Sequence, residues 1–128
     1  MNRFVLLSGT ILGVIAVILG AFGAHGLKAL ISAEAIQTFE TGIRYQMYHA
    51  FLLLIVGNQA SLPLKTKRLV GFLVLAGVLF FSGSIYLLST NTLTAFDFKQ
   101  IAFITPAGGL LLIFSWLVLL INFLKNKL

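Results

Sequence analysis

The sequence has no cysteine, and it has few charged residues of either sign. Without cysteine there is no disulfide framework, no thiol chemistry and no cysteine-ligated metal site. The 3 acidic residues and 2 histidines are too few to build the usual catalytic set of a soluble enzyme. Charged residues make up 9% of the chain and hydrophobic residues 59%, which is typical of a membrane protein. We therefore expect residues 1–128 to form a single membrane domain without enzymatic activity.

Four stretches are long enough to cross a bilayer as helices, which requires about 20 apolar residues. Three of them, residues 4–24, 69–89 and 101–124, contain no charged side chain. Residues 45–64 form the fourth uncharged run, and we place its span at about residues 43–60. Nothing alternates as barrel strands do, and backbone groups in lipid must be satisfied within the helix. The prediction is an all-α, integral membrane four-helix bundle.

The basic residues predict how this bundle is oriented, because cytoplasmic loops are enriched in Lys and Arg. Six basic residues without an acidic neighbour fall on one side of the membrane: Arg3, Lys65, Lys67, Arg68, Lys125 and Lys127. On the other side, three basic residues are balanced by three acidic ones: Lys28, Arg44 and Lys99 against Glu34, Glu40 and Asp97. Both termini are therefore expected in the cytoplasm. Because the net charge of +6 is explained by topology, we expect no nucleic-acid partner.

The N-terminal region also has an alternative interpretation. Arg3, an apolar run and the small residues of GAFGA are features of a cleavable signal peptide. The run is longer than the usual apolar region of such a peptide, however, and three further spans follow it. We expect the first span to be retained.

Small residues form a line along the first predicted helix. They recur every three or four residues: Gly9, Gly13, Ala16, Gly20 and Gly23. Lipid provides no hydrophobic force between helices, so small residues favour association by letting backbones approach closely. The line could pack within the bundle or form a seam for self-association. We favour packing within the bundle.

The second predicted helix begins outside the membrane. Ser32 is placed to cap it, and an apolar stripe then continues through the second span. We expect one helix from about residue 33 to about residue 59, with its first turns outside the hydrocarbon. Glu40 precedes Arg44 by four residues, which is the favourable order for an ion pair that neutralises Arg44 near the interface.

The start of the fourth helix has two alternatives. Thr105 could cap it with Pro106 at the first helical position. Alternatively, the helix begins near Asp97 and is kinked by Pro106. In both cases the backbone near residues 102–105 is expected to be irregular.

Four motifs occur in order along the chain: GAFGAHGLK (20–28), FETGIRYQMYHA (39–50), FSGSIYLL (81–88) and TPAGG (105–109). Together they resemble the domain-of-unknown-function 423 family, which includes bacterial inner-membrane proteins and the animal transmembrane protein 256. The resemblance covers essentially the whole chain. It implies a multi-pass, four-span protein of the bacterial inner (plasma) membrane, and it implies no activity.

The predicted topology places polar residues of all four motifs in the outer third of the bundle. On the second helix, Tyr45, Tyr48 and His49 share one face. Their polar atoms are expected to find partners inside the bundle. The candidates at matching depth are His25, Ser82, Ser84, Tyr86 and the carbonyls freed near Pro106. Taken singly, each polar residue is better explained as structural. Their common depth nevertheless predicts a site for a ligand or partner. It contains His25, Arg44, Tyr45, Tyr48, His49, Ser82, Ser84, Tyr86 and Thr105.

Several kinds of chemistry fit this set of residues poorly. No carboxylate lies within a span, which argues against ion or proton transport. Two histidines without cysteine do not complete a zinc site, and we expect neither metal nor cofactor. Haem bound by His25 and His49 is a minor alternative. Ser82 or Ser84 beside His49 would lack the acidic residue that orients the base.

Two functional hypotheses remain. The protein could be an accessory or assembly subunit of a membrane complex, with the glycine line and the polar layer as contact surfaces. Alternatively, it binds a lipid, a quinone or another amphipathic molecule through the polar cluster. We favour the accessory subunit because no catalytic set is present. Expected partners are membrane lipids and other membrane-protein subunits, or a second copy bound through Gly9 and Gly13.

Overall fold

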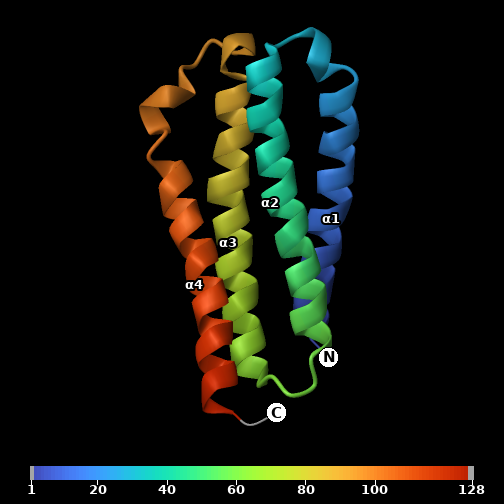
Figure 1. Ribbon diagram of the computed structural model, residues 1–128, viewed down its shortest axis with the longest axis vertical. Coiled ribbons are helices and arrows are strands. Elements are labelled where there is room, and N and C mark those ends of the chain that lie inside the picture. The colour runs from blue at the N-terminus through green and yellow to red at the C-terminus, as the bar shows by residue number, and fades with distance from the viewer. Residues whose placement is uncertain (1, 127–128) are drawn as a thin grey trace.

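The computed structural model describes residues 2–126 and is built from helices, with no strand in that range (Figure 1). The four long helices are α1 (Arg3–Ala24), α2 (Ala33–Asn58), α3 (Leu64–Ser89) and α4 (Ile104–Lys125). Three short 3-10 helices lie in the connections at one end: η1 (Leu27–Ala29), η2 (Asn91–Leu93) and η3 (Phe98–Ile101). Consecutive long helices run in opposite directions, so both ends of the chain lie at the other end of the bundle (Figure 1). The predicted all-α class is confirmed.

Helix α2 begins where its cap predicted. The Ser32 hydroxyl oxygen accepts a hydrogen bond from the backbone N–H of Ala35 at 3.1 Å. This bond satisfies one of the amide groups that a helix start leaves without a partner. The helix then continues without interruption through Gly42 to Asn58, one residue short of the predicted end.

The start of α4 matches neither predicted alternative. The Asp97 carboxylate accepts from the Lys99 N–H at 3.1 Å and so begins the short helix η3 instead of α4. The irregular backbone expected at residues 102–105 is found only at residues 102–103, which form a turn, and α4 begins at Ile104. Pro106 therefore lies within the first turn, where a missing N–H removes no helical hydrogen bond. Thr105 is inside the helix, so its hydroxyl does not cap the helix start.

Glycines set the closest contacts between the long helices. A Cβ added to Gly9 of α1 would lie 2.9 Å from the Ala50 carbonyl oxygen on α2. A Cβ on Gly108 of α4 would lie 2.7 Å from the Phe80 carbonyl carbon on α3. Contacts this short leave room only for hydrogen, so the two backbones touch directly at these points.

The line of small residues on α1 faces α2 of the same chain. Gly9, Ala16 and Gly23 are buried, and a Cβ on Gly23 would lie 3.1 Å from the Phe39 ring. Gly13 and Gly20 are looser, because a Cβ at either position would make only ordinary contacts, at 3.9 and 4.0 Å. Of the predicted packing residues, Gly9 and Gly23 therefore make the tight contacts.

Helix α3 holds the bundle together. It packs along α2 on one side and along α4 on the other, while α1 packs mainly on α2 (Figure 1). Helix α4 makes its main contacts with α3 alone. As a result α2 and α4 flank α3 without packing closely on each other, which leaves a groove between them.

Three helical segments in residues 2–126 are long and apolar enough to cross a membrane: Arg3–Ala29, Leu64–Ser89 and Ile104–Lys125. Helix α2 is as long as α3, at 26 residues, but it does not meet that apolar criterion. The difference lies in residues such as Arg44, Gln46 and His49 in its middle portion. Where these polar side chains are placed is therefore central to the site.

Candidate functional site

Gln46 joins three helices through its side-chain amide. It is only 3% exposed. Its Nε2 donates to the Leu12 carbonyl on α1 at 2.8 Å, and its Oε1 accepts from the Tyr86 hydroxyl on α3 at 2.7 Å. Sequence reasoning missed this residue. Its position four residues from both Gly42 and Ala50 could have revealed it, because these small residues mark the packed face of α2.

The predicted serines and Thr105 are also bonded within the bundle. Ser82 is fully buried and donates to the Gly42 carbonyl on α2 at 2.8 Å. The hydroxyl of Ser84 pairs with that of Thr105, which ties α3 to the first turn of α4. These hydroxyls therefore join α3 to α2 and to α4.

His49 is buried, with 4% exposure, and both ring nitrogens are hydrogen-bonded. Nδ1 lies 2.6 Å from the Tyr45 carbonyl oxygen, and Nε2 lies 3.1 Å from the indole Nε1 of Trp116 on α4. A carbonyl only accepts and an indole N–H only donates. His49 is therefore neutral, with its hydrogen on Nδ1, and Trp116 donates to Nε2.

Trp116 was not predicted as the partner of His49. His49 does bond to a polar group on another helix, as expected. The candidate partners are wrong, because Trp116 is not among them: they were His25, Ser82, Ser84, Tyr86 and carbonyls freed near Pro106. His49 also lies deeper than expected, because the neighbouring Ala50 packs opposite Gly13, halfway along α1. The sequence contains a single Trp, but no local pattern indicated that it would reach His49 on α2.

His25 does not join this cluster. It follows the last residue of α1 and is exposed. It lies beyond Gly23, which packs opposite Phe39, whereas His49 is level with Gly13. The two histidines are thus separated by about 18 Å along the bundle, at 1.5 Å per helical residue, and cannot ligate one haem iron.

Arg44, Tyr45 and Tyr48 lie on the outside of the bundle. Arg44 donates to the Thr41 hydroxyl at 3.0 Å, and the predicted ion pair with Glu40 does not form within residues 2–126. Tyr45 and Tyr48 are 42% and 54% exposed. In the described chain neither phenol hydroxyl makes a hydrogen bond, so the expectation of partners inside the bundle is wrong for both.

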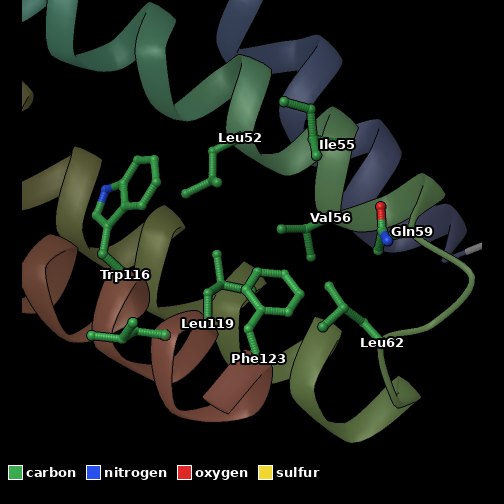
Figure 2. Close-up of a pocket in the computed structure, with 9 residues that line it drawn as sticks. Leu52, Ile55, Val56, Gln59, Leu62, Trp116, Leu119 and Phe123 are labelled. Carbon is green, nitrogen blue, oxygen red and sulfur yellow. The ribbon is translucent and has the colours of Figure 1, made fainter. Parts of the chain in front are cut away.

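Two adjoining cavities occupy the groove between α2 and α4. The first has a volume of about 310 Å³ and is lined by Tyr45, His49, Phe81, Gly109, Leu112, Ile113 and Trp116. The second has a volume of about 420 Å³ and extends from Trp116 to Gln59 and Leu62 (Figure 2). Between these ends its walls are apolar, formed by Leu52, Ile55, Val56, Leu119, Leu120 and Phe123. Trp116 lines both cavities, so the hydrogen bond to His49 crosses the groove where they meet.

Comparisons with known proteins agree with the motifs. The family described as "Protein of unknown function (DUF423)" matches residues 19–109. The chain is 39% identical over 125 residues to UPF0382 membrane protein SAB0533 of Staphylococcus aureus, covering 98% of each protein. It is 38% identical over 127 residues to UPF0382 membrane protein YwdK of Bacillus subtilis, again covering 98% of each.

A UPF0382 membrane protein of Haemophilus influenzae is 40% identical over 116 residues, covering 90% of this chain and 89% of that protein. No solved structure matches the chain. The relatives named membrane proteins and the apolar helices together identify it as a helical membrane protein. With the family match over residues 19–109 and near full-length relatives, the chain belongs to the DUF423 family.

Proposed function

We propose that the chain crosses the bacterial cytoplasmic membrane four times and binds a small amphipathic molecule in the groove between α2 and α4. Both termini would lie in the cytoplasm. Helix α2, with 26 residues, is about 39 Å long at 1.5 Å per residue, which exceeds the ~30 Å of a bilayer core. Its buried polar side chains, Gln46 and His49, point into the bundle, so lipid would not contact them.

The groove is the observation that carries the proposed binding function. Its two cavities, of about 310 and 420 Å³, fall in the size range of small-molecule sites. Apolar side chains dominate the walls, and the few polar groups gather in the first cavity. This arrangement suits a molecule with one mildly polar end and one apolar end. The groove replaces the outer polar cluster as the proposed site, because most of that cluster is bonded internally.

The hydrogen-bond pattern supports binding over catalysis. His49 uses both ring nitrogens in the bundle, so it has no free nitrogen with which to accept a proton from a substrate. Ser82 and Ser84 are bonded to Gly42 and Thr105, and neither hydroxyl is bonded to His49. A nucleophile needs an adjacent base, and these residues do not provide that pair.

Native mass spectrometry of protein purified from bacterial membranes in mild detergent tests this function. We expect the intact chain to retain a small molecule. Leu120→Phe, which enlarges a half-exposed residue in the groove, should reduce its retention. Leu117→Phe is the matched control, because Leu117 is similarly exposed on α4 but lines neither cavity. Absence of any retained molecule, or equal retention by all three proteins, would refute the proposed function.

An accessory or assembly role is the second proposal, supported by the outward face of α1. Val14, Val17 and Ile18 are each more than half exposed, and they form an apolar surface that a partner helix could cover as well as lipid does. The same mass spectrum distinguishes the two functions. A stoichiometric protein partner, present in place of a small molecule, would favour the accessory role.

A further inference from the structure

The chemistry of the groove points to one class of ligand. We propose that it binds an isoprenoid quinone, with the quinone ring in the first cavity and the start of the isoprenoid chain in the second. This inference rests on the proposed binding function and adds the identity of the ligand. It follows from the shape of the first cavity, from its hydrogen-bonding groups and from its depth in the bundle.

Aromatic rings form much of the wall of the first cavity. The rings of Tyr45 and Phe81 meet edge to face, with centroids 5.2 Å apart and planes at 70°. The rings of His49 and Trp116, which also line this cavity, have centroids 6.0 Å apart and planes at 76°. Aromatic rings pack favourably on one another in offset-stacked or edge-to-face arrangements. A planar head group therefore suits this cavity.

The polar groups of this cavity favour a neutral ligand with an acceptor atom. Its lining contains no Lys, Arg, Asp or Glu. A phosphate or carboxylate buried there would lack a compensating charge, which is energetically costly. The Tyr45 hydroxyl makes no hydrogen bond within residues 2–126 and can donate to a ligand. A quinone carbonyl is an acceptor of this kind.

The second cavity suits the apolar chain of such a molecule. It adjoins the first at Trp116 and follows the chain from Leu52 in α2 to Gln59, the residue after that helix, and α4 from Trp116 to Phe123 (Figure 2). Each of these segments rises about 10 Å at 1.5 Å per residue, so the cavity accommodates only the first part of a long chain. The remainder would continue into lipid between α2 and α4.

The depth of the site separates this ligand from a phospholipid. His49 is level with Gly13, which is the eleventh of the 22 residues in α1. In a four-span protein this level is near the middle of the bilayer. The charged head group of a phospholipid stays at the membrane surface, whereas a neutral prenylated ring dissolves in the hydrocarbon.

Fluorescence of Trp116 provides a direct test, because it is the single Trp of the chain and lines both cavities. Menaquinone with a short isoprenoid chain would be added to the purified protein in micelles. We expect saturable quenching. Ile113→Phe, which narrows the first cavity, should weaken binding at least about five-fold, since overpacking a site is costly. Ile121→Phe is its control, being similarly exposed on α4 but outside both cavities.

A second pair of variants tests the hydrogen bond. Tyr45→Phe should weaken quinone binding about five-fold through loss of one donor, whereas Tyr48→Phe should leave it unchanged. Quenching that rises linearly with quinone, and equally in Ile113→Phe, would overturn the quinone assignment. If native mass spectrometry instead finds a retained phospholipid or polyprenol, the quinone assignment fails and the binding function stands. If nothing is retained and no quenching saturates, both fail.

Discussion

At the scale of single residues, His49 and Trp116 make the one side-chain hydrogen bond that crosses from α2 to α4 in the described chain. The bond depends on a neutral imidazole with a bare Nε2. A proton on Nε2 would break the bond and place a charge in an apolar groove, so the environment favours the neutral ring. The pair thus bridges α2 and α4 where the two cavities adjoin, without introducing charge.

Replacing His49 with Phe should destabilise the bundle by about 1–3 kcal/mol, because the Trp116 N–H loses its acceptor in a poorly hydrated site. Replacing both residues with Phe removes donor and acceptor together. The double variant should therefore lose less stability than the sum of the single variants, with a coupling energy of about 0.5–3 kcal/mol. Thermal unfolding in detergent, followed by circular dichroism, measures all three. If the stability losses of the two single variants simply add in the double variant, the hydrogen bond between the two rings does not contribute to stability.

Gln46 in α2 and Gln59 just after the end of α2 allow the same substitution to be compared at two sites. Gln46→Leu leaves the half-buried Tyr86 hydroxyl and the Leu12 carbonyl without their partner and should cost about 1–3 kcal/mol. Gln59→Leu removes only an exposed bond to Ser61 and should cost less than about 0.5 kcal/mol. Chemical denaturation of both variants checks the difference. Equal destabilisation would show that the network around Gln46 contributes little.

At the scale of helices, the bundle depends on where glycine allows two backbones to meet. Gly108 lies in the TPAGG motif and faces the Phe80–Phe81 backbone, while the neighbouring Ser84–Thr105 pair joins the same two helices. Thr105 and Gly108 are three residues apart in α4, so they lie on the same face of that helix, toward α3. The motif is therefore explained by packing of α4 on α3, its main neighbour.

Gly108→Ala should destabilise the protein by about 1–3 kcal/mol, because the added methyl group clashes with the backbone of α3. Gly83→Ala is the control, since nothing lies within 4 Å of a Cβ at that position in α3. Ala is the better helix former, so this variant should gain about 0.5–1 kcal/mol. Opposite shifts in the melting temperature are the expected result. A loss in both variants would argue against the tight contact at Gly108.

Local signals predicted the elements better than the contacts between them. The Ser32 cap and the apolar stripe predicted the ends of α2 to within one residue, because both signals come from residues of this one segment and its cap. The start of α4 was missed, because η3 uses the Asp97 cap that a longer helix would have used. The Trp116 partner of His49 was missed for a different reason. It depends on how α2 and α4 are rotated about α3, and sequence periodicity does not specify that rotation.

At the scale of the whole molecule, the basic side chains gather at one end of the bundle. Five basic residues of the described chain lie at the end that carries both termini: Arg3, Lys65, Lys67, Arg68 and Lys125. Lys67 is buried there and donates to the Gly57 carbonyl at 3.4 Å. A cation near the C-terminus of α2 is favourable because carbonyl groups end the helix there. The sixth predicted residue, Lys127, lies outside the described residues.

The absence of cysteine makes the orientation directly testable, because every single-cysteine variant then carries only one reactive thiol. Ser61 lies in the connection between α2 and α3, and Thr94 lies in the connection between α3 and α4 at the opposite end. Both side chains are exposed. With the basic end in the cytoplasm, a membrane-impermeant maleimide added to intact cells should label Thr94→Cys and spare Ser61→Cys. Lysed cells, in which both sites should react, provide the control. Labelling of Ser61→Cys alone in intact cells would reverse the proposed orientation, and labelling of both would contradict a membrane-crossing α3.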